Sequence, residues 1–132
     1  PMPKIVLQQF AENAIRHGFS GAGETLTIQL TGRKAGGVWT IEISDDGAGF
    51  SPDVLKRLTR KLRASCQPGA PCAAEGGLSI GGMGILNTYA RLRAFYGQKF
   101  RMTLFNGKNG GAHIRLSAPC KEDFDARNDR RR

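Results

Sequence analysis

The sequence lacks any long apolar run and has few cysteines and few aromatic residues. A helix that crosses a bilayer needs about 18 or more consecutive apolar residues, so we expect no transmembrane helix in this chain. No basic and then apolar leader is present, and we therefore expect no secretion signal. Cys66, Cys72 and Cys120 match no zinc-site spacing. We interpret them as reduced thiols of a cytosolic protein.

Acidic residues are also scarce, and the net charge is +9, from 20 Lys and Arg against 11 Asp and Glu. Such an excess suits a nucleic acid, an anionic membrane surface or a phosphate-rich ligand. Much of it lies at 56–63 and 127–132. Aromatic residues do not interleave with the run at 56–63, and no recognised nucleic-acid-binding motif is present. A solvated helix face is the simpler interpretation, and a basic nucleic-acid-binding module stays open as the alternative.

The length of 132 residues, with 39% hydrophobic and 23% charged residues, is typical of one globular domain. Periodicity predicts helices over 3–17, 51–63 and 84–96, and strands over 24–31, 38–44, 100–105 and 112–118. The second helix should start with Ser51 as its N-cap and Pro52 as its first residue, and its apolar stripe is Leu55, Leu58 and Leu62. In the second strand, the residues expected to face inward are Trp39, Ile41 and Ile43. Short glycine-containing turns join the strands in antiparallel pairs. We therefore predict an α+β fold, a two-layer α/β sandwich whose mixed, mostly antiparallel sheet carries three helices on one face.

Two segments have no usable periodicity. Residues 64–83 are rich in Gly, Ala, Ser and Pro, and a structureless stretch of this length in a small domain is usually a functional lid or disordered. Residues 120–132 are polar. We therefore predict one domain over 1–119, with a flexible lid at 64–83, followed by a disordered tail over 120–132.

The first helix carries a polar flank beside its apolar stripe. Gln9, Asn13, Arg16 and His17 are spaced so that they share this flank. The side-chain carbonyl of Asn13 can bind a hard cation, and Arg16 and His17 can reach phosphates. An ordinary solvated face is the alternative.

The segment 45–50, DDGAGF, directly follows a predicted strand. One aspartate can accept a hydrogen bond from an exocyclic amine, while the glycines let a flat ring approach the backbone. A metal site has no second oxygen cluster to support it. A simple Asp-Gly turn is the remaining alternative.

A second glycine segment precedes the third helix. Gly82 and Gly84 lie where that helix begins, and the bare N–H groups of a helix start favour an anion. The segment is no P-loop, and it follows the lid rather than a strand, which argues against a dinucleotide fold. An ordinary glycine-rich turn remains possible at this point.

Together, LQQFAENAIRHG at 7–18, DDGAGF at 45–50 and GGMGILNTYARLRAFYG at 81–97 resemble the asparagine box and the two glycine boxes of the GHKL nucleotide-binding superfamily. This superfamily includes gyrase-type ATPases, heat-shock chaperones, mismatch-repair ATPases and histidine kinases. The patterns E-N-A-I-x-H-G and G-x-G-I-x-N-x-x-x-R-L are similar to those of LytS/YesM-type sensor histidine kinases. The resemblance covers 3–119 and implies the Bergerat (GHKL) fold of an ATP-binding, magnesium-dependent protein-histidine kinase domain.

The resemblance also implies a role for each matching residue. Asn13 should be the magnesium ligand, and Asp45 should bind the adenine amine. Gly47 and Gly49 should shape the base pocket, and 64–83 should be the ATP lid. The remaining nucleotide-binding residues that it implies, chiefly around the phosphates, are Arg16, His17, Gly82, Gly84 and Asn87.

Kinases of this kind phosphorylate a histidine on a separate dimerisation domain. Neither His17 nor His113 lies in an acceptor-helix pattern, and His113 is most simply a surface residue. We therefore expect the acceptor domain and a membrane sensor to precede Pro1 in a longer parent, and a response regulator to be its partner. The chain itself should be a monomeric cytoplasmic domain that binds no nucleic acid.

The competing interpretation is a hydrolysing ATPase of the same superfamily. One position separates this chain from those members. They carry a glutamate four residues before the magnesium asparagine, and this chain has Gln9 there. An amide cannot take a proton from water as a carboxylate can. The sequence therefore predicts ATP binding with very slow hydrolysis.

Overall fold

The computed structural model describes residues 4–18, 25–65 and 83–120. Its elements, in chain order, are α1 (Lys4–Gly18), β1 (Ile28–Ala35), β2 (Val38–Asp45), α2 (Pro52–Ser65), α3 (Met83–Tyr96), β3 (Arg101–Asn106) and β4 (Ala112–Pro119). The order of helices and strands predicted from the sequence is confirmed. Nearly all of the expected lid and of the expected tail lies outside the described residues.

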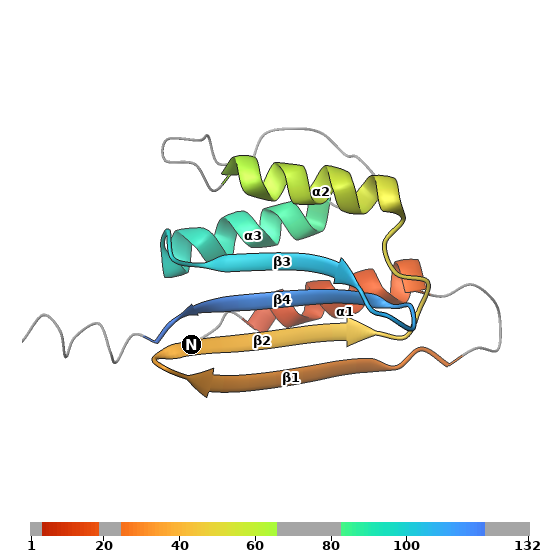
Figure 1. Ribbon diagram of the computed structural model, residues 1–132, viewed down its shortest axis with the longest axis horizontal. Helices are drawn as coiled ribbons and strands as arrows, with labels where there is room; N and C mark the ends of the chain where they lie inside the picture. Colours follow the sequence, from red (N-terminus) through yellow and green to blue (C-terminus); the bar gives the residue numbers. More distant parts are fainter. Residues whose placement is uncertain (1–3, 19–24, 66–82, 121–132) are drawn as a thin grey trace, which may run out of the picture.

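The four strands form one antiparallel sheet in the order β1-β2-β4-β3. The three helices lie on one side of it, as Figure 1 shows. The predicted two-layer sandwich is therefore confirmed. No helix within the described ranges is long and apolar enough to cross a membrane.

Strand β1 differs from its prediction. It starts at Ile28 rather than at residue 24 and continues to Ala35, because a Gly36-Gly37 turn with φ of 56° and 74° pairs Ala35 directly with Val38. Turns with positive φ match the twist of a hairpin, and here only glycine takes them. All eight residues of β1 are exposed. The apolar alternation in this segment therefore marks strand pairing and not a buried face.

The core lies between the helices and the three strands β2, β4 and β3. Each layer contributes side chains that are almost fully buried, among them Phe10 from α1, Leu58 from α2 and Leu116 from β4. Burying a side chain of this kind stabilises the fold by about 1.5–3 kcal/mol. In β2, Ile43 is buried as predicted, whereas Trp39 and Ile41 are half-buried against the core.

Helix α2 begins and packs as the sequence predicts. The Ser51 Oγ accepts a hydrogen bond from the Val54 N–H at 3.4 Å, and Pro52 is the first helical residue. Leu58 and Leu62 are buried and Leu55 is half-buried. The opposite face is left with basic residues, all exposed: Lys56, Arg57, Arg60, Lys61 and Arg63.

Candidate functional site

The segments that carry the predicted site lie toward one end of the molecule. In Figure 1, the end of β2, the turn between β3 and β4, and the start of α3 all point to the right-hand side. Helix α1 packs against both α3 and β2. The fold therefore brings together elements that are far apart in the sequence.

Asp45 is the last residue of β2, and its half-buried carboxylate is held by backbone amides. Its Oδ1 accepts hydrogen bonds from the Gly47 N–H at 2.9 Å and from the Ala112 N–H at 3.2 Å. Among the described residues, both bonds of this carboxylate fall on the same oxygen. The side chain is therefore fixed in position while its Oδ2 keeps its capacity to accept a hydrogen bond.

The neighbouring Asp46 has a different task. Its Oδ1 accepts a hydrogen bond from the Thr27 N–H at 2.7 Å, and its own N–H donates to the Thr27 carbonyl at 3.2 Å. The Thr27 N–H lowers the pKa of the exposed Asp46 carboxyl. Asp46 thus ties the approach to β1 onto the end of β2. The two adjacent aspartates therefore hold different segments: Asp45 contacts Gly47 and the β3–β4 turn, whereas Asp46 contacts Thr27.

The turn between β3 and β4 supports Asp45 at very close range. Gly111 is buried with a φ of 81°, and a Cβ placed on it would lie 1.8 Å from the Asp45 carbonyl oxygen. Only glycine lets the two backbones approach so closely. This close approach positions the Ala112 N–H to reach the Asp45 carboxylate.

A side chain from the end of β3 fixes the other end of the DDGAGF loop. The Asn106 Oδ1 accepts from the Phe50 N–H at 2.8 Å, and the Asn106 Nδ2 donates to the Phe50 carbonyl at 2.8 Å. Gly49, with a φ of 76°, lies directly beneath this amide, because a Cβ there would come 2.8 Å from the Asn106 Oδ1. The loop is thus clamped at both ends by the β3–β4 hairpin.

Helices α1 and α3 are joined by a polar contact inside their interface. The buried Thr88 Oγ1 donates a hydrogen bond to the Gln9 Oε1. Gln9 lies one turn before Asn13 on α1, and Thr88 follows Asn87 on α3. The contact therefore places the asparagine box beside the part of the second glycine box that lies in α3. Glu12, in contrast, is exposed and accepts from the Gln8 amide at 3.1 Å.

Only some of the predicted site residues have side chains that the structure describes. Asp45, Gly47 and Gly49 form one clamped loop, while Gly84 is half-buried in the first turn of α3 and Asn87 is exposed on it. The backbone of Asn13, Arg16 and His17 lies in α1. Their side chains and Gly82 lie outside the described part of the chain.

Sequence reasoning did not identify the supporting residues Asn106, Gly111 and Thr88. The glycines of the turn predicted only a turn, and its contact with residues 45–50 crosses about 60 positions of sequence. His113 lies on β4 with a partly exposed side chain, as expected, but it also makes contacts that the sequence did not predict. Its half-buried ring contacts Glu42, with 3.0 Å between the Nδ1 and Oε1 atoms, and stacks on Phe105.

The comparison with protein families tests the resemblance carried by the three sequence boxes. The family described as histidine kinase-, DNA gyrase B-, and HSP90-like ATPase matches residues 2–122. The chain belongs to this family. The family membership and the fold implied by the three sequence boxes are confirmed.

Two curated relatives of this ATPase-family domain are sensor proteins, one of them a histidine kinase. This chain is 24% identical over 122 residues to the sensor histidine kinase YesM of Bacillus subtilis (strain 168). It is also 24% identical over 121 residues to the sensor protein LytS of the same strain. Each match covers 92% of this chain but 18% of the relative. The chain therefore corresponds to a minor part of proteins that are several times longer.

Solved structures agree on the fold. Full-length ShkA, determined in complex with AMPPNP, matches with a TM-score of 0.54 and 23% identity, over 86% of this chain and 20% of that one. At this identity the likeness concerns the arrangement of the backbone. It supports the fold of the ATPase-family domain independently of the sequence boxes.

Proposed function

We propose that this chain is the ATP-binding catalytic domain of a sensor histidine kinase, which donates the γ-phosphoryl group of ATP to a histidine outside the chain. The observation that carries the proposal is the clamped Asp45 carboxylate. One of its oxygens is held by two backbone amides, and the other can accept the exocyclic amine of adenine. The family and the relative that is named a sensor histidine kinase support the reaction class.

The proposed roles of the other residues follow the sequence boxes. Gly47 and Gly49 let the adenine ring approach the loop that Asn106 clamps. Gly82, Gly84 and Asn87 would close around the phosphates at the start of α3, where backbone N–H groups favour an anion. Arg16 and His17 would reach the phosphates from α1.

Asn13 is the residue proposed to hold magnesium. Within the described residues no group of three His, Cys, Asp or Glu side chains gathers into a metal cage. Mg²⁺ commonly takes one or two protein oxygens and completes its shell with water and substrate phosphates, so the single side-chain amide of Asn13 fits this mode. Bound with ATP, the ion would neutralise phosphate charge. The protein itself holds the nucleotide base and orients the phosphates.

The domain is proposed to transfer phosphate rather than to hydrolyse ATP. Gln9 stands where a general base would be needed, and its amide oxygen already accepts a hydrogen bond from the Thr88 hydroxyl. Without a carboxylate at this position, water is not activated. Phosphoryl transfer then depends on positioning, and a histidine presented by another domain is the nucleophile.

We further propose the context of the domain. The catalytic unit covers 1–119, with the ATP lid at 64–83 and the tail at 120–132. The acceptor histidine, its dimerisation domain and the contacts to a response regulator would belong to the parent kinase, of which this monomeric domain would be a cytoplasmic part. The 18% coverage of the relatives supports this division.

Calorimetry with an ATP analogue tests the proposal. Asp45→Asn should weaken analogue binding more than tenfold, because loss of a charge-assisted hydrogen bond costs about 1.5–3 kcal/mol. Asp46→Asn is the matched control, since it removes the same charge at the next position and weakens only the bond from Thr27. Equal binding by Asp45→Asn and the wild type, with both folded by circular dichroism, would refute the proposed site.

A further inference from the structure

The face of the sheet opposite the helices carries an ordered set of polar side chains. Residues directly opposite one another on antiparallel strands point to the same face. Arg33 of β1 is paired with Thr40 of β2, and Thr40 is paired with Ser117 of β4. The next row places Thr31, Glu42 and Arg115 side by side in the same way.

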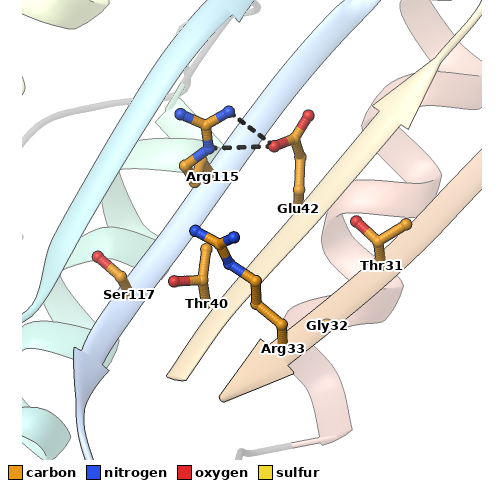
Figure 2. A pocket seen from close by; sticks show the side chains of 7 residues that line it. All are labelled: Thr31, Gly32, Arg33, Thr40, Glu42, Arg115 and Ser117. Carbon is orange, nitrogen blue, oxygen red and sulfur yellow. Dashed lines mark hydrogen bonds and ion pairs between the residues drawn. The ribbon is translucent and has the colours of Figure 1, made fainter. Parts of the chain in front are cut away.

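These two rows surround a hollow of about 430 Å³ on the open face of β1, β2 and β4. Figure 2 shows the Arg33 side chain extending from β1 across the hollow above Thr40, with Ser117 beyond it and Glu42 and Arg115 along one side. The predicted nucleotide residues do not line it. We call it the open-face hollow.

The acidic group of the open-face hollow is already neutralised. Glu42 is bonded through Oε1 to the His113 Nδ1 at 3.0 Å, and its Oε2 accepts from the Arg115 Nε at 3.0 Å and Nη2 at 2.9 Å. Arg115 also lies over the Phe105 ring, with 5.1 Å between the guanidinium carbon and the ring centroid. Both oxygens of Glu42 are therefore committed within the protein, and the charge of Arg115 is balanced by Glu42 through two of its five N–H donors.

Arg33 is the cation that remains. It is exposed, and its guanidinium makes no ion pair or hydrogen bond within the described residues. Its guanidinium lies above Thr40, and Ser117 and Thr31 line the same hollow. A planar guanidinium beside hydroxyl donors is suited to a carboxylate, which it can bind through two parallel hydrogen bonds.

We propose that the open-face hollow is a docking site for an extended acidic segment of a partner protein, with one carboxylate seated on Arg33, Thr40 and Ser117. Charge complementarity points to an acidic occupant. All the lining residues come from three neighbouring strands of one sheet, so a ligand is contacted from one side. An extended segment gains further contacts along the strands, whereas a small free anion does not.

The probe is a fluorescent peptide of about eight residues, a strand's length, in which glutamate alternates with serine. A peptide with glutamine in place of glutamate is the neutral counterpart. Binding to the complete chain is followed by fluorescence anisotropy at about 0.15 M salt, which screens diffuse attraction. Arg33→Gln should weaken binding about tenfold, and Thr40→Val about threefold, as expected for a charged and a neutral hydrogen bond.

Arg60→Gln is the matched control, because it removes the same charge from an exposed arginine on α2. It should change the peptide affinity less than about twofold. Equal losses in Arg33→Gln and Arg60→Gln, or no loss in either, would overturn the proposal. So would competition by free glutamate or inorganic phosphate at peptide-like concentrations, since this would indicate a small-anion site.

The test is independent of the proposed nucleotide site. Arg33→Gln should bind an ATP analogue like the wild type, because Arg33 lies on the other face of the sheet from the helices. Loss of peptide binding together with normal analogue binding is the expected result. A variant that loses both would show a general folding defect, and the docking proposal would then fall with it.

Discussion

Gly111→Ala is the substitution whose consequence can be worked out most directly from the structure. The new Cβ would lie 1.8 Å from the Asp45 carbonyl oxygen and 2.9 Å from the Asp45 carbonyl carbon, and the residue has a φ of 81°. Both near atoms are backbone, so no side chain can move aside. The hairpin would have to retreat by about 1.6 Å or more to regain ordinary contact. That movement would break the bond from Ala112 to Asp45.

The expected cost has two parts, which a control variant separates. A left-handed φ costs an alanine about 1–2 kcal/mol, and the forced displacement of packed backbone adds about 1–3 kcal/mol. Gly110→Ala has a similar φ of 91°, but its nearest neighbour, the Gly47 carbonyl oxygen, is 3.6 Å away. It should therefore suffer the first cost alone.

Urea unfolding and calorimetry with an ATP analogue measure the two effects. Gly111→Ala should lower the free energy of unfolding by about 2–5 kcal/mol, and it should weaken analogue binding even where the domain is still folded. Gly110→Ala should lose about 1–2 kcal/mol and keep its affinity. If the two variants behave alike, the close approach of the hairpin to Asp45 is not what positions the carboxylate.

Two further predictions concern Glu42 and Gln9. The hydrogen bond with His113, helped by Arg115, lowers the pKa of Glu42 from its ordinary value of 4.5, although partial burial opposes the shift. The stabilising contribution of the Glu42 carboxylate is therefore present above about pH 4.5 and is lost as the pH falls through the lowered pKa. In acid, the melting temperature of the wild type should therefore fall more steeply with pH than that of Glu42→Gln. Gln9→Glu should raise the rate of phosphate release from ATP by about 10²-fold or more, because it supplies the general base that the site lacks. Gln8→Glu, at the neighbouring exposed position, should leave this rate unchanged. Equal rates in the two variants would contradict the role of position 9.

Local sequence signals predicted the elements that depend on local physics. Ser51 and Pro52 mark the start of α2 because a hydroxyl cap and a fixed φ act within one turn. The alternation over 38–44 predicted which side of β2 faces the core, since side chains on a strand alternate. The boxes that carry Asp45 and Asn13 were likewise readable, because each is a short run with its own chemistry.

Features that depend on pairing between distant segments were not readable. Strand β1 is exposed because it lies at the edge of the sheet, beyond the helices, and nothing in the sequence of 28–35 indicates that position. The same holds for Asn106, whose amide is an ordinary strand-end residue until Phe50 lies opposite it. A sequence pattern predicts a helix or a strand, but which residue lies opposite a given side chain depends on how the strands pair.

The hairpin between β3 and β4 shows why such long-range contacts matter for the proposed chemistry. On one side, Gly111 and Ala112 hold Asp45. On the other, Gly107 lies so close to His113 that a Cβ there would come 2.6 Å from the His113 Nε2, and His113 in turn contacts Glu42 at the open-face hollow. One short turn therefore supports both the loop proposed to bind adenine and the polar cluster on the opposite face. Glycine is required on both sides of this turn because neither approach leaves room for a side chain.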